Sequence, residues 1–299
     1  MEAKIKIIFS MALFGTISIF VKNIPLPSGE IALFRAIIAA VVIIIYKIII
    51  GKKISFSDIK KDLPALFISG MTMGFNWILL FQAYKYTTVS IATLSYYFAP
   101  VIVMVACPIL FKEKLTIKQV VCFVMATVGL IMVIGVSGMG KSSNNLIGIG
   151  FGLGAAVLYA TVVLFNKFIK NVTGIDKTLI QFLAAIIVLT PYVFATTGIN
   201  IGSLDNIGII NLLILGIIHT GICYCLYFSS LKDLKGQEAS ILSYIDPLIA
   251  IIISVTILGE SLLLIQIIGG MMILGFTLLN EIKSKSRRVY DIANSKNMK

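Results

Sequence analysis

An acidic side chain lies inside a long apolar stretch of this sequence, directly before a proline. Asp246 and Pro247 stand in the middle of the run 237–258. A carboxylate in hydrocarbon costs roughly 3 kcal/mol unless it faces a cavity or a partner, and proline bends a helix and frees a backbone carbonyl one turn earlier. The pair predicts a polar site that binds a substrate ammonium group or accepts a proton. A structural carboxylate, hydrogen-bonded between helices, is the alternative.

The single histidine of the chain is a second candidate for proton chemistry. His219 lies in the apolar run 207–230. An imidazole titrates near neutral pH, so His219 joins Asp246 as a possible proton-coupling group. A lone histidine within a membrane helix is more commonly hydrogen-bonded to a neighbouring helix, and we favour that interpretation.

Aromatic and amide side chains form the third group of candidates. Most occupy mid-span positions that the internal repeat described below relates in pairs. A lining of this type suits amphipathic organic solutes, which need a few polar anchors in an apolar pocket, although packing between helices is an equal alternative. The predicted substrate cavity comprises Phe14, Asn76, Trp77, Tyr96, Tyr97, Tyr159, Tyr224, Tyr244 and Asp246.

The composition sets the environment of these residues. Hydrophobic residues make up 59% of the 299 residues, charged residues 13%, and the mean hydropathy is +1.03. Soluble domains are near 45–50% apolar and about 25% charged, which excludes an ordinary globular enzyme. Long runs that are apolar on every side predict transmembrane helices rather than a β-barrel. The ten runs are 5–21, 28–50, 63–84, 89–111, 116–136, 146–165, 178–197, 207–230, 237–258 and 262–281.

The distribution of charge predicts the orientation of these spans. A net charge of +12 alone could suggest nucleic acid. With the N-terminus in the cytoplasm, however, only Lys22, Lys85 and Lys141 fall in outer loops and Arg35 falls within a span, while every other lysine and arginine is cytoplasmic. This asymmetry follows the positive-inside rule. It predicts both termini in the cytoplasm, contact with membrane lipids and no nucleic-acid partner.

Four further charged residues are assigned structural roles. We expect Glu30 and Arg35 of the second run to form a structural or gating ion pair rather than to contact substrate, with Glu30 near the solvated interface. Glu113 and Glu260 end the fourth and ninth runs, and we expect them to anchor helix ends and loops.

The cysteines give no sign of a metal or redox centre. All four lie in apolar runs without ligand-like spacing to histidine or carboxylate, so we interpret them as small packing residues. They are Cys107, Cys122, Cys223 and Cys225. We therefore expect neither a metal nor a cofactor.

The two halves of the sequence resemble each other under a constant shift. The matched pairs are Phe81 with Phe228, Tyr97 with Tyr244, Pro100 with Pro247, Glu113 with Glu260, and Gln119 with Gln266. Each half holds five spans, an odd number, so the halves are inserted in opposite orientations. Inverted repeats place a binding site near the membrane midplane and permit alternating access. The predicted units are repeats 1–137 and 146–282, an outer loop 138–145 and a basic tail 283–299, with hinges at Pro100 and Pro247.

The paired Pro-(x)12-Glu spacing, each time followed by a glutamine and a closing helix, resembles the drug/metabolite transporter superfamily. More closely, the chain resembles its ten-helix, EamA-type branch, and the stretch from 240 to Pro247 and on to Glu260 is the most family-like. The resemblance implies a secondary carrier, commonly an exporter of amino acids or other small metabolites. It also implies a central cavity bordered by spans 1, 3, 4, 6, 8 and 9.

The leading hypothesis is therefore a secondary transporter in the cytoplasmic membrane, acting as a monomer or homodimer. It would move a small organic metabolite, such as an amino acid, by alternating access, with export as the favoured direction. The cavity spans lack a cluster of lysine and arginine, which argues against sugar phosphates and nucleotides. One alternative is a membrane enzyme acting on lipid, but no clustered catalytic set is visible and we expect no enzyme activity. The other is a passive channel or facilitator.

Overall fold

The computed structural model describes residues 2–51, 56–111, 116–139, 143–230, 233–234, 239 and 242–282. Every regular element in these ranges is helical, which confirms the predicted all-α class. The first half holds α1 (Glu2–Gly15), α2 (Ile17–Lys22), α3 (Ser28–Ile50), α4 (Phe56–Tyr86), α5 (Val89–Tyr96), α6 (Ala99–Phe111) and α7 (Ile117–Met139). The second half holds α8 (Ser143–Asn166), α9 (Gly174–Thr196), η1 (Ile201–Ser203), α10 (Asn206–Ile214), η2 (Leu215–Ile222), α11 (Cys223–Ser230), α13 (Ile245–Thr256) and α14 (Leu264–Glu281).

Eight helical stretches among the described residues are long and apolar enough to cross a membrane. They coincide with the first eight predicted spans. The regions of the ninth and tenth runs hold two shorter apolar helices, Ile245–Thr256 and Leu264–Asn280. The outward faces carry large apolar side chains, such as Ile49 at 78% exposure and Ile117 at 85%. A soluble protein rarely exposes apolar surface on this scale, whereas lipid tails cover it without cost.

Several predicted spans are interrupted. The first is broken at Thr16, between α1 and α2, and the fourth at 97–98, between α5 and α6. In the ninth, Tyr244 forms a turn directly before α13. The interruption at Tyr244 lies about one turn before Pro247, the position at which the proline predicts an irregular backbone. Pro247, like Pro100, stands in the first turn of the helix that follows the interruption. Proline is tolerated there because the N–H groups of the first helical turn have no acceptor within the helix, so the N–H group that proline lacks is not needed.

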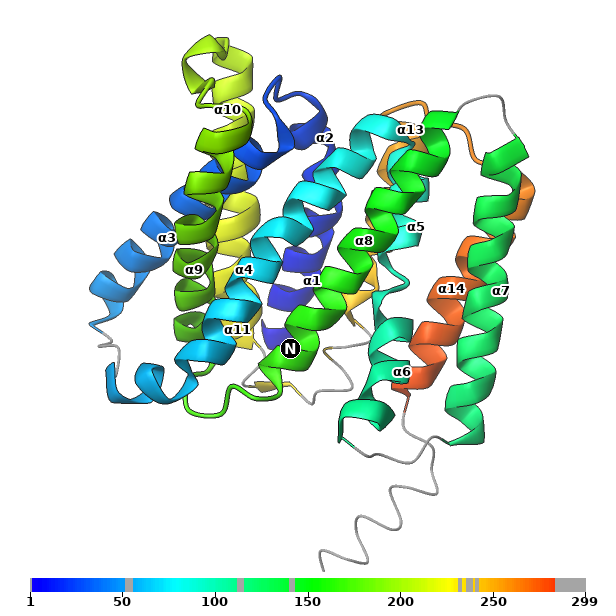
Figure 1. The fold of residues 1–299 in the computed structure, drawn as a ribbon, viewed down its shortest axis with the longest axis horizontal. Coiled ribbons are helices and arrows are strands. Elements are labelled where there is room, and N and C mark those ends of the chain that lie inside the picture. The colour runs from blue at the N-terminus through cyan, green and yellow to red at the C-terminus, as the bar shows by residue number, and fades with distance from the viewer. Residues whose placement is uncertain are drawn as a thin grey trace, which may run out of the picture.

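The two halves of the chain are interleaved. The helices lie side by side, with α3 toward one end of the molecule and α7 and α14 at the other (Figure 1). The most extensive contacts all join a helix of the first half to one of the second: α4 with α8 and α9, α7 with α14, and α3 with α9 and η2. Any space between these pairs is therefore lined by both halves.

Glycines allow the closest of these approaches. A Cβ atom on Gly129 of α7 would lie 2.6 Å from the carbonyl oxygen of Gly269 in α14, and the reciprocal distance is 2.5 Å. Since neither backbone can yield, only glycine fits at this crossing. Similarly, a Cβ atom on Gly15 would lie 2.7 Å from the backbone oxygen of Asp246, which brings α1 against α13.

We expect Gly269→Ala to lower the free energy of unfolding by about 1–3 kcal/mol, because the added methyl group meets the backbone of α7. The matched control is Gly275→Ala in the same helix, where nothing lies within 4 Å of the added atom. The control should be as stable as wild type or slightly more stable, since alanine favours the helix. Unfolding in detergent measures both variants. Equal stability of the two would show that the α7–α14 crossing is not this tight.

Candidate functional site

A buried arginine lies at the boundary between the two halves. Arg35 of α3 is only 3% exposed. Its Nε–H donates a 2.6 Å hydrogen bond to Oγ1 of Thr220 in η2. The guanidinium carbon lies 4.5 Å from the ring centroid of Trp77 and 5.6 Å from that of Phe81, both on α4. Cation–π contacts of this kind replace part of the hydration that the charge loses on burial.

The π-helical segment η2 positions Thr220. Its hydroxyl donates to the carbonyl of Leu215, five residues earlier, so its oxygen is free to accept from Arg35. A Cβ atom on Gly216 would lie 2.6 Å from Ile38, and one on Gly221 would lie 2.6 Å from Val42. The two glycines therefore let η2 approach α3 closely enough for the Arg35–Thr220 bond to form.

Aromatic rings extend from Arg35 toward α1 and α11. Trp77 contacts Phe182 of α9 with centroids 5.5 Å apart, and Phe182 contacts Tyr224 of α11 at 5.4 Å. Tyr224 in turn contacts Phe14 of α1 at 5.3 Å. All three contacts are edge-on, the arrangement that aromatic pairs prefer. We call Phe14, Trp77, Phe182 and Tyr224 the Tyr224 cluster.

Three tyrosines and a carboxylate form a second group, which we call the tyrosine cluster. The hydroxyl of Tyr97 donates a 2.6 Å hydrogen bond to Oδ2 of Asp246. The ring of Tyr96 lies 5.7 Å from that of Tyr97 and 5.4 Å from that of Tyr159. Tyr97 lies in the break between α5 and α6, and Asp246 in the first turn of α13. The two helix interruptions therefore meet at this hydrogen bond.

The two clusters are neighbours. Phe14 contacts Tyr224, and a Cβ atom on the next residue, Gly15, would lie 2.7 Å from the backbone oxygen of Asp246. Asp246 is partly exposed and Tyr159 is 41% exposed, although both lie in the middle of their spans. The region brings together one cation, one carboxylate and several aromatic rings, which are side chains of the kind that bind amphipathic solutes.

His219 stands beside this region rather than within it. It is 1% exposed, its Nε2 lies 2.7 Å from the hydroxyl of Thr16, and its Nδ1 lies 3.2 Å from the carbonyl oxygen of Ile214. The favoured prediction, a histidine hydrogen-bonded to a neighbouring helix, is confirmed. The Thr16 hydroxyl also donates a 2.8 Å hydrogen bond to the carbonyl of Leu13, so its oxygen can accept from the Nε2–H of His219.

Two members of the predicted cavity have other surroundings. Asn76 is 2% exposed, and its Nδ2 donates a 2.6 Å hydrogen bond to the carbonyl of Ala155, which joins α4 to α8. Tyr244 lines a cavity of about 310 Å³ against α14, together with Leu94, Leu248 and Gln266.

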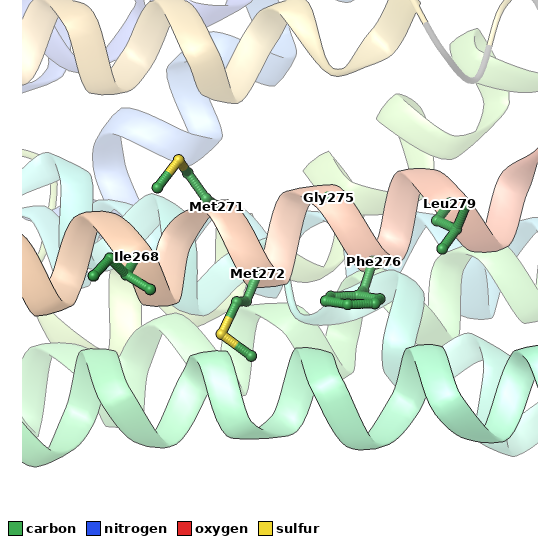
Figure 2. Close-up of a pocket in the computed structure, with 6 residues that line it drawn as sticks. All are labelled: Ile268, Met271, Met272, Gly275, Phe276 and Leu279. Atoms are coloured by element: carbon green, nitrogen blue, oxygen red, sulfur yellow. The ribbon is translucent and has the colours of Figure 1, made fainter.

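A further depression of about 410 Å³ runs along α14 and is lined by Ile268, Met271, Met272, Gly275, Phe276 and Leu279. Met272 and Phe276 point toward α7, and Met271 points away from it (Figure 2). No charged side chain lines this depression, so it offers no anchor to a polar solute.

The predicted ion pair between Glu30 and Arg35 is wrong. Glu30 is fully buried rather than solvated, and its carboxylate accepts from the backbone N–H and the Nδ2 of Asn200, at 2.6 and 2.7 Å. Asn200 precedes η1, far along the chain, so local spacing could not reveal it. The sequence could have indicated a role for Arg35 in the site only through its position, because an arginine within a membrane span commonly marks a functional site.

Glu260 joins three elements, which together form what we call the Glu260 junction. Its carboxylate pairs with Lys22 of α2, accepts a 2.7 Å bond from the backbone N–H of Val89 at the start of α5, and accepts from the hydroxyl of Ser254 in α13. The predicted anchoring role of Glu260 is confirmed. Its predicted counterpart, Glu113, lies outside the described residues.

The cysteines are free and buried, as predicted for packing residues. Within the described ranges, no group of three or more histidine, cysteine, aspartate or glutamate side chains could hold a metal ion.

Comparison with known proteins places the chain in a family. Residues 3–135 and 146–281 each match the EamA-like transporter family. The two matches cover most of the chain, which therefore belongs to this family. The resemblance inferred from the sequence is confirmed, and the chain is a multi-pass membrane protein of transporter type.

Individual relatives agree with this assignment. The uncharacterized transporter YxxF of Bacillus subtilis is 29% identical over 287 residues, which span 95% of this chain and 91% of that protein. An uncharacterized transporter of Archaeoglobus fulgidus is 27% identical over 91% of this chain and 94% of its own length. Solute carrier family 35 member G1 of Mus musculus is 30% identical over 55% of this chain and 47% of its own. A solved crystal structure with 17% identity shares the fold, with a TM-score of 0.64 over 92% of this chain and 94% of that one.

We expect Thr220→Val to destabilise the protein by about 1–3 kcal/mol, because it removes the acceptor of the buried Arg35 Nε–H without changing the volume of the side chain much. Thr220→Ser keeps the hydroxyl and serves as the control. The unfolding midpoint of each variant in detergent reports the difference. A valine variant as stable as the serine variant would contradict the role assigned to this hydrogen bond.

Proposed function

We propose that this protein is a secondary carrier that moves a small organic metabolite, an amino acid or a related amphipathic solute, across the cytoplasmic membrane. The observation that carries the proposal is the meeting of Tyr97 and Asp246 at two helix interruptions, one from each half of the chain. A polar site with interrupted helices at the junction of two halves is typical of secondary transporters. The names of the family and of the relatives support transport in general, and the nature of the solute is our inference from the site.

We propose further that the two halves are inverted repeats, 1–137 and 146–282, that alternate access to this site. In support, the break at Tyr97 and the turn at Tyr244 fall at positions that the repeat relates, and Pro100 and Pro247 follow at the same spacing. Backbone interruptions of this kind are tolerated in a membrane only where protein or a cavity surrounds them. The two prolines are the proposed hinges.

Closure at one end is assigned to the Glu260 junction. With the N-terminus in the cytoplasm, Lys22, Val89 and Glu260 lie at the outer end of the molecule. The junction ties α2 and α5 of the first half to the end of α13. In the proposed mechanism, rocking of one half against the other would break this junction, and its role would be to hold the outer side closed.

The energy for transport is proposed to come from a proton or solute gradient, with export as the favoured direction. Asp246 is the proposed coupling group because it is the carboxylate that faces the site, and the binding of a proton or of an ammonium group at its oxygens would be mutually exclusive. His219 is a secondary candidate through its contact with Thr16. A passive facilitator remains the competing function, and saturable counterflow distinguishes a carrier from a channel.

We expect proteoliposomes containing the wild-type protein to show saturable counterflow of at least one member of a panel of labelled amino acids and organic cations, faster under a pH gradient. Asp246→Asn should abolish the response to the gradient because the amide does not take up a proton. Uptake is measured with and without the gradient.

The control for this substitution is Asp205→Asn. Asp205 is exposed and caps α10 by accepting from the N–H of Gly208, a role that asparagine fills equally well. If uptake by Asp246→Asn still responds to the pH gradient, Asp246 is a structural carboxylate. Flux without saturation or counterflow would favour a channel.

A second prediction concerns the Glu260 junction. In a protein that carries Tyr224→Cys, Lys22→Met should increase the rate of labelling from outside by an impermeant maleimide about fivefold, as expected for an ion pair worth about 1 kcal/mol. The background has its four native cysteines replaced.

The matched control is Lys6→Met, which removes the pair between Lys6 and the exposed Glu2 on one turn of α1. The labelling rate of Lys6→Met should equal that of the protein without this substitution. If Lys22→Met leaves the labelling rate unchanged, the junction does not hold the outer side closed.

A further inference from the structure

The contacts of Arg35 leave most of its donors without an acceptor. A guanidinium carries five N–H donors. In the described part of the chain, Arg35 uses its Nε–H on Thr220, a neutral hydroxyl, and lays its face over Trp77 and Phe81. The ion pairs found among the described residues join other cations to carboxylates, and none involves Arg35.

A charge in this condition is expensive. Arg35 is 3% exposed and is the eighth residue of the 23-residue helix α3, and a charge buried in an apolar span without an ion-pair partner costs several kcal/mol. Its terminal nitrogens are not among the fully enclosed polar atoms that lack a hydrogen-bond partner, so a ligand can reach them. A purely structural role would be better served by a carboxylate partner on η2 or α4. The arrangement instead holds the guanidinium rigidly, by one hydrogen bond and two aromatic faces, with its terminal N–H groups uncommitted.

The carboxylate of the neighbouring tyrosine cluster has another partner. Oδ2 of Asp246 accepts from the hydroxyl of Tyr97, and no ion pair joins Asp246 to Arg35 in the part of the chain that the structure describes. The rings of the Tyr224 cluster run from Trp77, beside Arg35, to Phe14, and the next residue, Gly15, lies against the backbone of Asp246. The site thus presents a cation and a carboxylate that face the same aromatic surroundings without pairing with each other.

We propose that Arg35 binds the carboxylate of the transported solute while Asp246 binds its amino group, so that the carrier selects zwitterionic amino acids over amines and over simple carboxylates. The inference rests on the transport function proposed above. The planar fork of a guanidinium matches the two oxygens of a carboxylate, and desolvation strengthens the pair. The aromatic rings of the Tyr224 cluster then receive the apolar part of the solute.

The first test uses the wild-type protein and matched solutes. Proteoliposomes are preloaded with each of a panel of L-amino acids, and counterflow of the labelled amino acid is followed. The amino acid that is transported best is then challenged with its own amide, which lacks the carboxylate, and with the corresponding acid that lacks the amino group. The free amino acid should compete at least tenfold better than either analogue. Equal competition by the amide would overturn the inference and leave the transport function standing.

The second test uses variants of the arginine. Arg35→Gln should reduce amino-acid counterflow by roughly tenfold to a hundredfold and remove the preference for the free acid over the amide. Arg35→Lys keeps the positive charge but loses the planar fork of the guanidinium, so its counterflow should be intermediate between that of wild type and that of Arg35→Gln. Lys85→Gln is the control, since Lys85 is an exposed cation that donates to the carbonyl of Leu26. An Arg35→Gln variant that keeps the wild-type preference would overturn the inference.

A binding measurement separates this inference from the transport function. The unfolding midpoint of the purified protein is recorded with and without each amino acid of the panel. Stabilisation of wild type but not of Arg35→Gln, without any counterflow, would uphold the inference and refute transport. If no amino acid gives either counterflow or stabilisation, the inference is overturned. If Arg35→Gln fails to fold, the inference is tested by the competition between the free amino acid and its amide in counterflow by the wild-type protein.

Discussion

In the hydrocarbon region of a membrane, backbone N–H and C=O groups and charged side chains must find partners within the protein, and this constraint determines how the helices of this fold are arranged. Most helices run without interruption because only a closed helix satisfies its own N–H and C=O groups in hydrocarbon. The breaks at Thr16, at 97–98 and at Tyr244 therefore have to lie inside the protein. Their side chains meet polar partners from the other half of the chain: His219 for Thr16, and Asp246 for Tyr97. The irregular backbone and the polar groups gather in one region for the same physical reason.

Close backbone approach makes this gathering possible. Gly15 brings α1 onto the backbone of Asp246, and Gly216 and Gly221 bring η2 onto α3. In membranes, helix contact depends on packing and hydrogen bonding rather than on apolar burial, so small residues determine which helices can touch. The Arg35–Thr220 hydrogen bond depends on this approach, and so does the orientation of the guanidinium over Trp77. In this fold, the small residues that allow close helix packing therefore also determine where the charged side chain of Arg35 lies.

The sequence predicted the parts of this structure that depend on local composition. The first eight apolar runs and the anchoring role of Glu260 follow from span length and from charge at helix ends, although α4 begins at Phe56 rather than at 63. Asp246 was predicted to be a site residue because intramembrane carboxylates are rare, and that role stays a prediction. The partners were not predictable, since Thr220 for Arg35 and Asn200 for Glu30 are set by tertiary contacts between distant segments. Pro247 predicts an irregular backbone about one turn earlier, but its sequence context does not determine whether the helix bends there or is interrupted.

The Glu260 junction has a consequence for how the molecule can open. One carboxylate serves the ammonium group of Lys22, the backbone of Val89 and the hydroxyl of Ser254. Oε1 takes the ammonium group and Oε2 takes the other two donors, so one side chain of the second half is tied to two separate elements of the first half. A displacement of α2 alone costs only the ion pair, whereas a displacement of α5 takes the acceptor from a backbone N–H group, which costs about 1–3 kcal/mol if no other acceptor replaces it. The two elements are therefore held to the end of α13 with unequal strength by the same carboxylate.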